Sequence, residues 1–360
     1  TTGCVEDGPD LASIPNEPNI YSGNTEMATI TIDNAAVIVS RVFNSSRSVG
    51  ANKTVILATV PEHLANLFDL FSDELLPGIY NKIGSAASIS VVEHIACPDR
   101  GSFKVNGTLD GFSGAGIMAI DFTNCQIREV SYHEDGQLHI NFIDSYGING
   151  YGIDGMMDFV LLRMATGYDS DESIGISLTG SLSYSRNLAG NTMYENTWLD
   201  YVGQDYDTGK MFKYESLGIN VSFDDVFSQL SGGSLDLNGY ITDSIIGSVN
   251  VQTLSTLRFS SPAIIYPDVS GEVLFSGNNS SIRLIVMSGE HFKLELDFDG
   301  DGSPDTVRYI LYSEFRLEDQ YGVGSSDYLD LHDSDGDGMH DTWETRYFDL
   351  DPDVSLSLIH

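Results

Sequence analysis

The sequence predicts a mainly β protein, built on a large antiparallel sheet or sandwich, with one N-terminal helix and a C-terminal calcium loop that leads into a short helix. Between about residues 86 and 316, short alternating or β-branched apolar runs are separated by Gly, Asn, Asp and Ser, which is typical of antiparallel strands. A helical period precedes these runs at about 61–76, and an aspartate-rich loop follows them at 333–344. The chain has 360 residues, 41% of them hydrophobic, so it can bury a large core.

Changes in composition divide the chain into three expected parts. Residues 1–23 are polar and contain prolines, which predicts an extended tail. Residues 24–316 hold the helix and the strand-like runs, and we expect them to form a β-rich body. Residues 317–360 contain the aspartate-rich loop and form a calcium-binding segment.

The N-terminal residues Thr1-Thr2-Gly3-Cys4 indicate an exported protein after signal removal. The Gly-Cys pair also resembles the end of a bacterial lipoprotein signal, which would make Cys4 a lipid anchor. Against this, Thr1 stands where such signals usually carry Leu, and residues 1–3 would be absent from a mature lipoprotein. The alternative for Cys4 is a free or intermolecularly paired thiol.

Two segments at the start of the body precede the expected sheet. Residues 27–33 and 35–40 are interpreted as strands or buried apolar segments. Pro61 then begins a helical stretch with a single apolar face, which ends at Pro77-Gly78. That face consists of Leu64, Leu67, Phe68, Phe71 and Leu75.

Within the strand-rich region, Cys97 and Cys125 flank one predicted strand segment. They are the natural intramolecular disulfide in an oxidising compartment, and the alternative is two buried thiols. Residues 144–171 are rich in Gly, Tyr and Asp, which fits either an exposed binding loop or glycine-broken edge strands.

The clearest motif is the loop from Asp333 to Glu344. An EF-hand-type loop needs oxygen ligands at positions 1, 3, 5, 7, 9 and 12 and a glycine at position 6. This loop meets every requirement, so it predicts a Ca²⁺ site with a bidentate glutamate. The predicted ligands are Asp333, Asp335, Asp337, the Met339 carbonyl, Asp341 and Glu344. The segment resembles the thrombospondin type 3 calcium repeats found at the ends of many exported bacterial proteins, which implies a calcium-binding spacer.

A second loop, Asp297 to Asp305, has the same pattern at positions 1, 3, 5, 6, 7 and 9 but carries Arg308 at position 12. Its predicted Ca²⁺ ligands are Asp297, Asp299, Asp301, Ser303 and Asp305. Strand-like runs flank it, so we expect a hairpin loop that resembles the calcium loops of FG-GAP and VCBS β repeats. The missing glutamate predicts weaker binding, and the alternative is a solvated acidic turn. The wider stretch 264–315 resembles a module of uncharacterised exported or lipoprotein-like bacterial proteins.

The charge excludes several classes of partner. With 53 acidic and 17 basic residues, the net charge is −36, which would repel nucleic acids and anionic membranes. No apolar run approaches the ~18 residues that a membrane-spanning helix needs. The sequence contains no recognised nucleophile elbow, zinc-protease or phosphate-loop motif, so we expect a protein that is not an enzyme, with no catalytic residues.

These patterns predict an exported calcium-binding structural or adhesive protein, secreted or at the cell surface, that self-assembles into an extracellular filament. The N-terminal tail would add a strand to the sheet of a second copy. One alternative is an outer-membrane lipoprotein anchored through Cys4. Another is a secreted glycan-binding or carbohydrate-active protein that uses Trp198, Tyr201 and Tyr206 as an aromatic platform, although such residues are also typical of cores and edge strands.

Overall fold

The computed structural model describes eleven stretches of the chain, which contain fourteen strands and one helix. The described residues are 19–43, 88–97, 100–110, 115–126, 132–144, 153–166, 175–205, 209–224, 232–260, 269–287 and 291–311. The chain divides into two compact units. Unit 1 comprises Thr1–Gly23 and Pro61–Gly218, and unit 2 comprises Asn24–Val60 and Ile219–His360. The mainly β, antiparallel architecture predicted from the sequence is confirmed.

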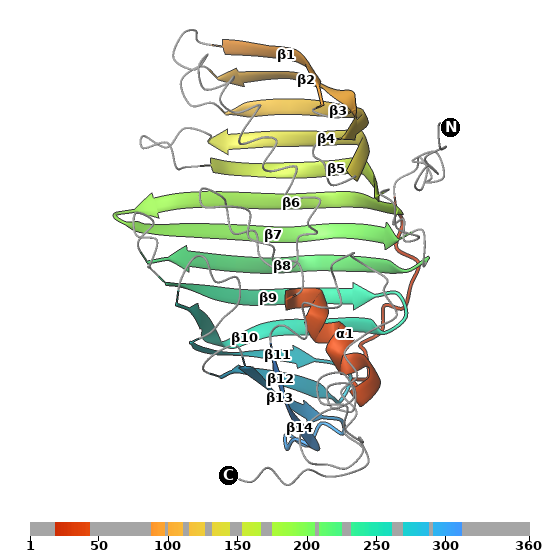
Figure 1. Cartoon of the computed structure of the whole chain (residues 1–360), viewed down its shortest axis with the longest axis vertical. Helices are drawn as coiled ribbons and strands as arrows, with labels where there is room; N and C mark the ends of the chain where they lie inside the picture. Colours follow the sequence, from red (N-terminus) through yellow and green to blue (C-terminus); the bar gives the residue numbers. More distant parts are fainter. Residues whose placement is uncertain are drawn as a thin grey trace, which may run out of the picture. The chain divides into compact units, whose positions relative to one another are not determined.

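Unit 1 is an antiparallel meander in which each strand pairs with the next one along the chain (Figure 1). Short connections between strands of alternating pattern favour this order, because consecutive antiparallel strands need only a hairpin turn. Its strands are β1 (Ser88–Ala96), β2 (Arg100–Asp110), β3 (Gly116–Gln126), β4 (Tyr132–Asp144), β5 (Ile153–Thr166), β6 (Gly175–Ala189) and β7 (Thr192–Asp205). The next strand, β8 (Met211–Phe223), contains the boundary after Gly218.

Aromatic packing forms part of the core of unit 1. Tyr201 of β7 is 1% exposed, and its ring centroid lies 5.1 Å from that of Tyr214 and 6.2 Å from that of Phe212, both on β8. Burial raises the pKa of Tyr201 well above its usual value, and the nearby Tyr214 adds to this rise. The neutral phenol is therefore the form that the folded core favours.

The disulfide predicted between Cys97 and Cys125 is confirmed. Cys97 directly follows β1, and Cys125 lies in β3, so the bond joins the two ends of a three-strand segment. Both side chains are buried, and their Cα atoms lie 5.5 Å apart. This spacing falls within the usual range for a disulfide.

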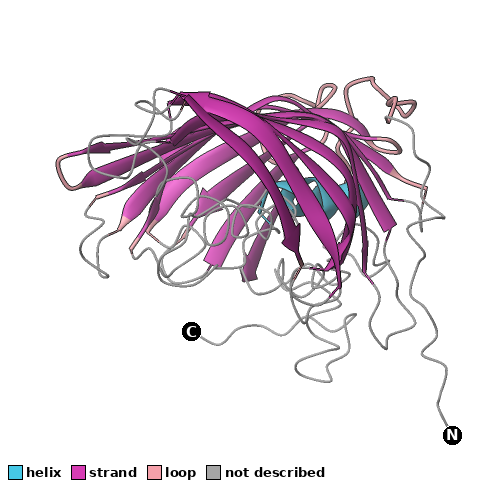
Figure 2. Cartoon of the chain, turned by 90° about the horizontal axis from the view of Figure 1, so that it is seen from above, coloured by secondary structure: helices cyan, strands magenta, loops and turns pink. Residues whose placement is uncertain are grey.

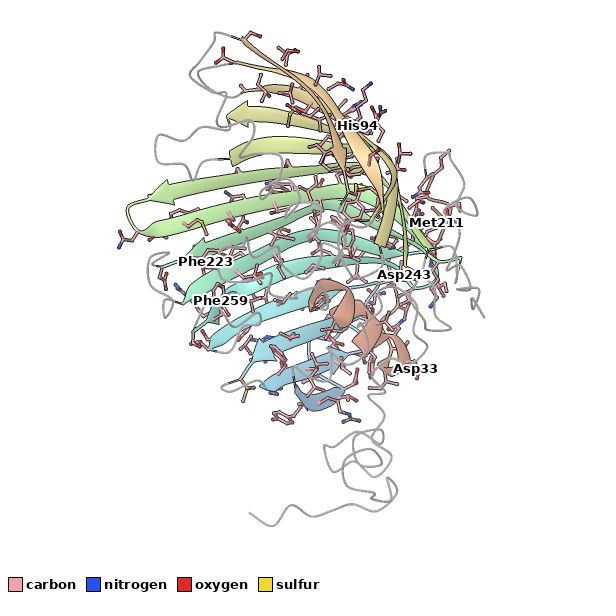
Figure 3. All side chains as sticks on the ribbon, turned by 45° about the horizontal axis from the view of Figure 1, so that its top comes forward. Asp33, His94, Met211, Phe223, Asp243 and Phe259 are labelled. Carbon is pink, nitrogen blue, oxygen red and sulfur yellow. A yellow bond between two sulfur atoms is a disulfide. The ribbon has the colours of Figure 1, made fainter. Side chains whose placement is uncertain are left out.

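Unit 2 contains a second antiparallel meander, again with neighbouring strands paired in chain order. Its strands are β9 (Gly233–Asp243), β10 (Gly247–Phe259), β11 (Ser270–Ser276), β12 (Ser281–Val286), β13 (His291–Asp297) and β14 (Thr306–Leu311). Alternate side chains of β12 are buried, as expected for a strand with one face on a core. Phe223 of β8 packs edge-on against Phe259 of β10 with centroids 5.7 Å apart (Figure 3).

The described helix, α1 (Ile32–Phe43), corrects the interpretation of residues 35–40. Residues 35–39 are buried, as predicted, but the segment is helical and not extended. The Asn34 side chain accepts a hydrogen bond from the Thr31 amide at 2.9 Å, and the Thr31 carbonyl accepts one from Ala35 at 3.0 Å. This arrangement resembles a capping box, with Asn34 in place of the usual Glu or Gln. Asp33 in the first turn adds a favourable charge at the helix N-terminus.

One face of α1 covers the sheet of unit 2 (Figures 1 and 2). Val37 and Ile38 lie against Ile241 of β9 and against Val249 and Val251 of β10. All five side chains are buried. Hydrophobic burial on this sheet therefore selects the helix, although the run Val37-Ile38-Val39 has high strand propensity.

The segment Asn24–Ile30, which we call the N-terminal strap, is hydrogen-bonded to two turns and to the start of β10 in unit 2 before the chain enters α1. The Asn24 amide donates to the Ser244 carbonyl at 3.0 Å, and the Ala28 amide donates to Ser248 at 2.8 Å. Farther along, the Ile30 amide donates to the Ser280 hydroxyl at 2.8 Å. The side chains of Ala28 and Ile30 are buried, so the strap forms part of the packed structure of this unit.

Three of the sequence-based predictions lie wholly or mostly outside the described residues: the extended tail at 1–23, of which only 19–23 are described, the helix at about 61–76 and the C-terminal segment 317–360. Within the described residues, no helix is long and apolar enough to cross a membrane.

Candidate metal centre

The loop between β13 and β14 carries a group of acidic side chains. It runs from Asp297, the last residue of β13, to Asp305, just before β14. Gly300 and Gly302 have φ angles of 75° and 86°, in the left-handed region that glycine adopts without strain. The Asp-Gly-Asp-Gly sequence therefore favours the reversal that returns the chain into the hairpin.

The first aspartate organises the loop. Asp297 is 8% exposed, and its Oδ1 accepts a hydrogen bond from the Gly300 amide at 2.7 Å. Its Oδ2 accepts one from the Gly302 amide at 3.0 Å. These two contacts fix the orientation of the Asp297 carboxyl group within the loop.

The last aspartate closes the loop. The Asp305 amide donates to the Leu296 carbonyl at 2.8 Å, which pairs the two ends of the hairpin. Its Oδ2 accepts a hydrogen bond from the Phe298 amide at 2.7 Å. The side chain is therefore turned back toward Asp297 and Asp299.

Asp297, Asp299 and Asp305 form a group that can hold a metal ion. One carboxylate oxygen from each lies within 4.8 Å of the others. Three negative charges at this spacing repel one another, and a bound cation would remove that repulsion. Carboxylate oxygens are the ligands of hard cations.

The structure does not bring the whole predicted ligand set of this loop together. Asp301 lies outside the acidic group, and its Oδ1 accepts a hydrogen bond from the Ser303 amide at 2.7 Å. Arg308, at the twelfth position, lies in β14 opposite Leu294 and donates to the Val307 carbonyl at 3.0 Å. A cation in this loop would thus use three protein carboxylates, with carbonyl oxygens or water completing its coordination.

Gly300 also connects the loop to the neighbouring β11–β12 turn. A Cβ atom at Gly300 would lie 2.9 Å from the Asn279 carbonyl oxygen, so the two backbones are in close contact. The residues on either side of Asn279 hold the N-terminal strap. The Asn278 amide donates to the Ala28 carbonyl at 2.6 Å, and Ser280 accepts the hydrogen bond from Ile30. Within unit 2, the acidic loop therefore contacts the β11–β12 turn, and this turn is hydrogen-bonded to the strap.

A charge network lies on the strands beside the loop. Arg283 of β12 forms ion pairs with Glu272 of β11 at 2.6 Å and with Glu295 of β13 at 3.4 Å. Lys293 pairs with Glu295 at 2.6 Å. The hydrogen bond to Glu272 raises the pKa of Arg283, and the hydrogen bond to Glu295 raises that of Lys293. Arg283 and Lys293 thus balance the negative charges of Glu272 and Glu295, which are not part of the acidic group in the loop.

The remaining predicted site residues lie outside the described residues. They are the Asp333–Glu344 ligands, Cys4 and Tyr206. Trp198 and Tyr201 are described, and they lie on opposite faces of β7, because Trp198 is 49% exposed and Tyr201 is buried. They cannot form the single aromatic platform that the sequence suggested.

No protein-family model, curated protein sequence or solved structure matches this chain.

Proposed function

We propose that this chain is a calcium-binding structural protein of the cell surface or extracellular space, in which the Asp297–Asp305 loop holds Ca²⁺ and stabilises unit 2. The observation that carries the proposal is the group formed by Asp297, Asp299 and Asp305, with Asp297 held by two backbone amides. The net charge of −36 adds a general reason for cations to stabilise the folded chain.

Calcium fits this loop better than other common metals. Three carboxylates, with carbonyl oxygens or water in the remaining positions, suit an ion that takes 6–8 oxygen ligands, whereas Mg²⁺ prefers a small, near-ideal octahedron that retains its waters. The acidic group contains no Cys or His, so it does not resemble a zinc site. The Cys97–Cys125 disulfide supports an oxidising compartment, where calcium is also abundant.

Self-association is a second candidate function, favoured by the edge of unit 1. Among the described strands, β1 pairs only with β2, over nine residues. An unpaired strand edge is a template for a strand from another chain. The N-terminal tail of a second copy is the partner that we propose for this edge.

The test combines calcium titration with thermal unfolding and light scattering. Protein freed of metal with a chelator should bind Ca²⁺ in a calorimeter and melt at a higher temperature once loaded. Because the Asp333–Glu344 loop is a second proposed site, the titration is repeated in Glu344→Gln, which should leave the Asp297 loop as the remaining site. Asp297→Asn should then abolish the remaining binding, whereas Asp301→Asn, with the same charge change outside the acidic group, should retain most of it.

Light scattering tests the assembly separately. Particles larger than the monomer should grow with protein concentration, and Val92→Lys should reduce them, because a lysine on an edge strand opposes pairing. Val92 is suited to this change because it is largely exposed on β1. Unchanged melting and unchanged particle size after chelation would contradict the proposed role of calcium.

A further inference from the structure

An exposed aromatic strip lies on one face of unit 1. Tyr194 and Trp198 of β7 are 45% and 49% exposed. They are four residues apart in one strand, so they point to the same face and lie about 13 Å apart. We call Tyr194, Asn196, Trp198 and Asp200, together with the serines opposite the last three on β6, the Trp198 strip.

A glycine supports the tryptophan ring. A Cβ atom at Gly218 of β8 would lie 2.9 Å from Cζ3 and 3.0 Å from Cη2 of Trp198. The six-membered ring therefore lies directly over the Gly218 backbone. It occupies the space that a side chain at position 218 would fill. Half of the residue remains accessible, which gives a fixed aromatic surface that costs little conformational entropy when a ligand binds.

Small hydrogen-bonding groups surround the two rings. Ser185 lies opposite Asn196, Ser183 opposite Trp198 and Ser181 opposite Asp200. Directly opposed residues of an antiparallel pair share a face, and the hydrogen bond from Asn196 to the Ser185 hydroxyl at 3.2 Å agrees with this placement. Asp200 is exposed and can accept hydrogen bonds from hydroxyl groups.

We propose that the Trp198 strip binds a neutral polysaccharide chain. The aromatic rings of Trp198 and Tyr194 would pack against the apolar C–H faces of sugar rings, while the serines, Asn196 and Asp200 exchange hydrogen bonds with their hydroxyls. The strip from Tyr194 to Asp200 is about 20 Å long, enough for several sugar units. This proposal does not rest on calcium binding.

The composition of the strip favours a neutral polysaccharide over a protein, a nucleic acid or an anionic lipid. A protein partner would need a continuous apolar surface at the centre of its interface, but serine and asparagine separate the two rings. Nucleic acids and anionic lipids are disfavoured, because the strip offers no basic residue and the chain has a net charge of −36. A neutral polyol matches both the aromatic and the polar groups.

The test follows the fluorescence of Trp198 as defined oligosaccharides are added. The sequence contains two tryptophans, so the variant Trp343→Phe leaves Trp198 as the single tryptophan, which is excited selectively at a wavelength that tyrosine does not absorb. Cellohexaose, xylohexaose, mannohexaose and chitohexaose are titrated one at a time. We expect a saturable blue shift with at least one of them, in the presence of either calcium or chelator.

Binding of the responding oligosaccharide is then measured by calorimetry in variants of the full chain. Trp198→Ala should weaken it by at least about tenfold, and Tyr194→Ala by a smaller factor. Trp198→Phe should retain part of the affinity, and Gly218→Val should weaken binding by displacing the ring. The matched control is Tyr240→Ala, since Tyr240 is an aromatic residue of similar exposure in unit 2 and should have no effect.

Three results would overturn the proposal. The first is no saturable binding of any of the four oligosaccharides by the wild-type chain. The second is equal binding by wild type and Trp198→Ala, provided that their melting temperatures agree. The third is loss of self-association in Trp198→Ala without any effect on oligosaccharides, which would assign the strip to a second copy of the chain.

Discussion

Different interactions hold the strands of the two units together at their ends. In unit 1, the β1–β3 segment is closed by the Cys97–Cys125 disulfide, a covalent bond between buried residues. In unit 2, the β11–β14 region relies on the acidic Asp297–Asp305 loop, its contact with Asn279 and the hydrogen bonds of the strap. The two units should therefore respond to different reagents, unit 1 to reductants and unit 2 to chelators.

Removing the disulfide should have the largest effect. The double variant Cys97→Ser and Cys125→Ser should lower the free energy of unfolding of unit 1 by about 3 to 4 kcal/mol, because the bond closes a loop of 28 residues. Denaturant unfolding followed by hydrogen exchange in the β1–β3 segment measures the loss. Calcium affinity should not change, and a loss of calcium affinity would break the proposed independence of the two units.

Asp297→Asn should have the next largest effect, and the loss should be greater with calcium than without it, because the variant loses both a cation ligand and one acceptor for a loop amide. At a calcium concentration 100 times the Kd, binding contributes about 2.7 kcal/mol to stability, and this contribution should disappear. Thermal unfolding with and without calcium, in the Glu344→Gln background, measures it. A variant that still gains the full stabilisation would show that the acidic loop is not the site.

A pair of glycine substitutions, one in each unit, separates backbone strain from calcium binding. Gly302 in the acidic loop and Gly190 in the β6–β7 turn both have positive φ angles, and a Cβ atom would meet nothing within 4 Å at either position. Changing either residue to Ala should cost about 1 kcal/mol through backbone strain alone. Only Gly302→Ala should weaken calcium binding, which calorimetry on both variants would reveal.

Breaking the ion pair between Arg283 and Glu272 should have the smallest effect. The Arg283 side chain is 44% exposed and the Glu272 side chain 28%, so solvent screens the pair. Glu272→Gln should destabilise unit 2 by less than about 1 kcal/mol, and less still at high salt. If Glu272→Gln lowered the stability of unit 2 as much as Asp297→Asn does, the charge network, and not the acidic loop, would be the main stabilising feature of this unit.

Local pattern was sufficient to predict the strands and the disulfide. Alternating runs such as Gly101–Leu109 and Gly175–Tyr184 fall within β2 and β6, because polar and apolar residues alternate where one face is buried. The Asp-Gly pattern also predicted the acidic hairpin loop between β13 and β14, and its flanking strands are present. These features depend on residues that are close in sequence.

Other features depended on contacts that the pattern does not contain. Residues 35–40 have strand propensity, and their helix is selected by the Asn34 cap and by burial against β9 and β10. Asp301 has the expected spacing of a ligand, but the turn directs its carboxylate to the Ser303 amide. By contrast, the sequence alone could have predicted that Trp198 and Tyr201 face opposite sides of the sheet, because residues three apart in a strand point to opposite faces.

We expect calcium in the acidic loop to stabilise the strap through the β11–β12 turn. Hydrogen exchange with mass detection, on the Glu344→Gln chain with calcium or chelator, tests it directly. Calcium should slow exchange in peptides covering 297–303, 278–280 and 28–30, with no change in β1–β3, and Asp297→Asn should remove this protection. Exchange that is unchanged by calcium in these three segments, or slowed equally in β1–β3, would contradict the claim.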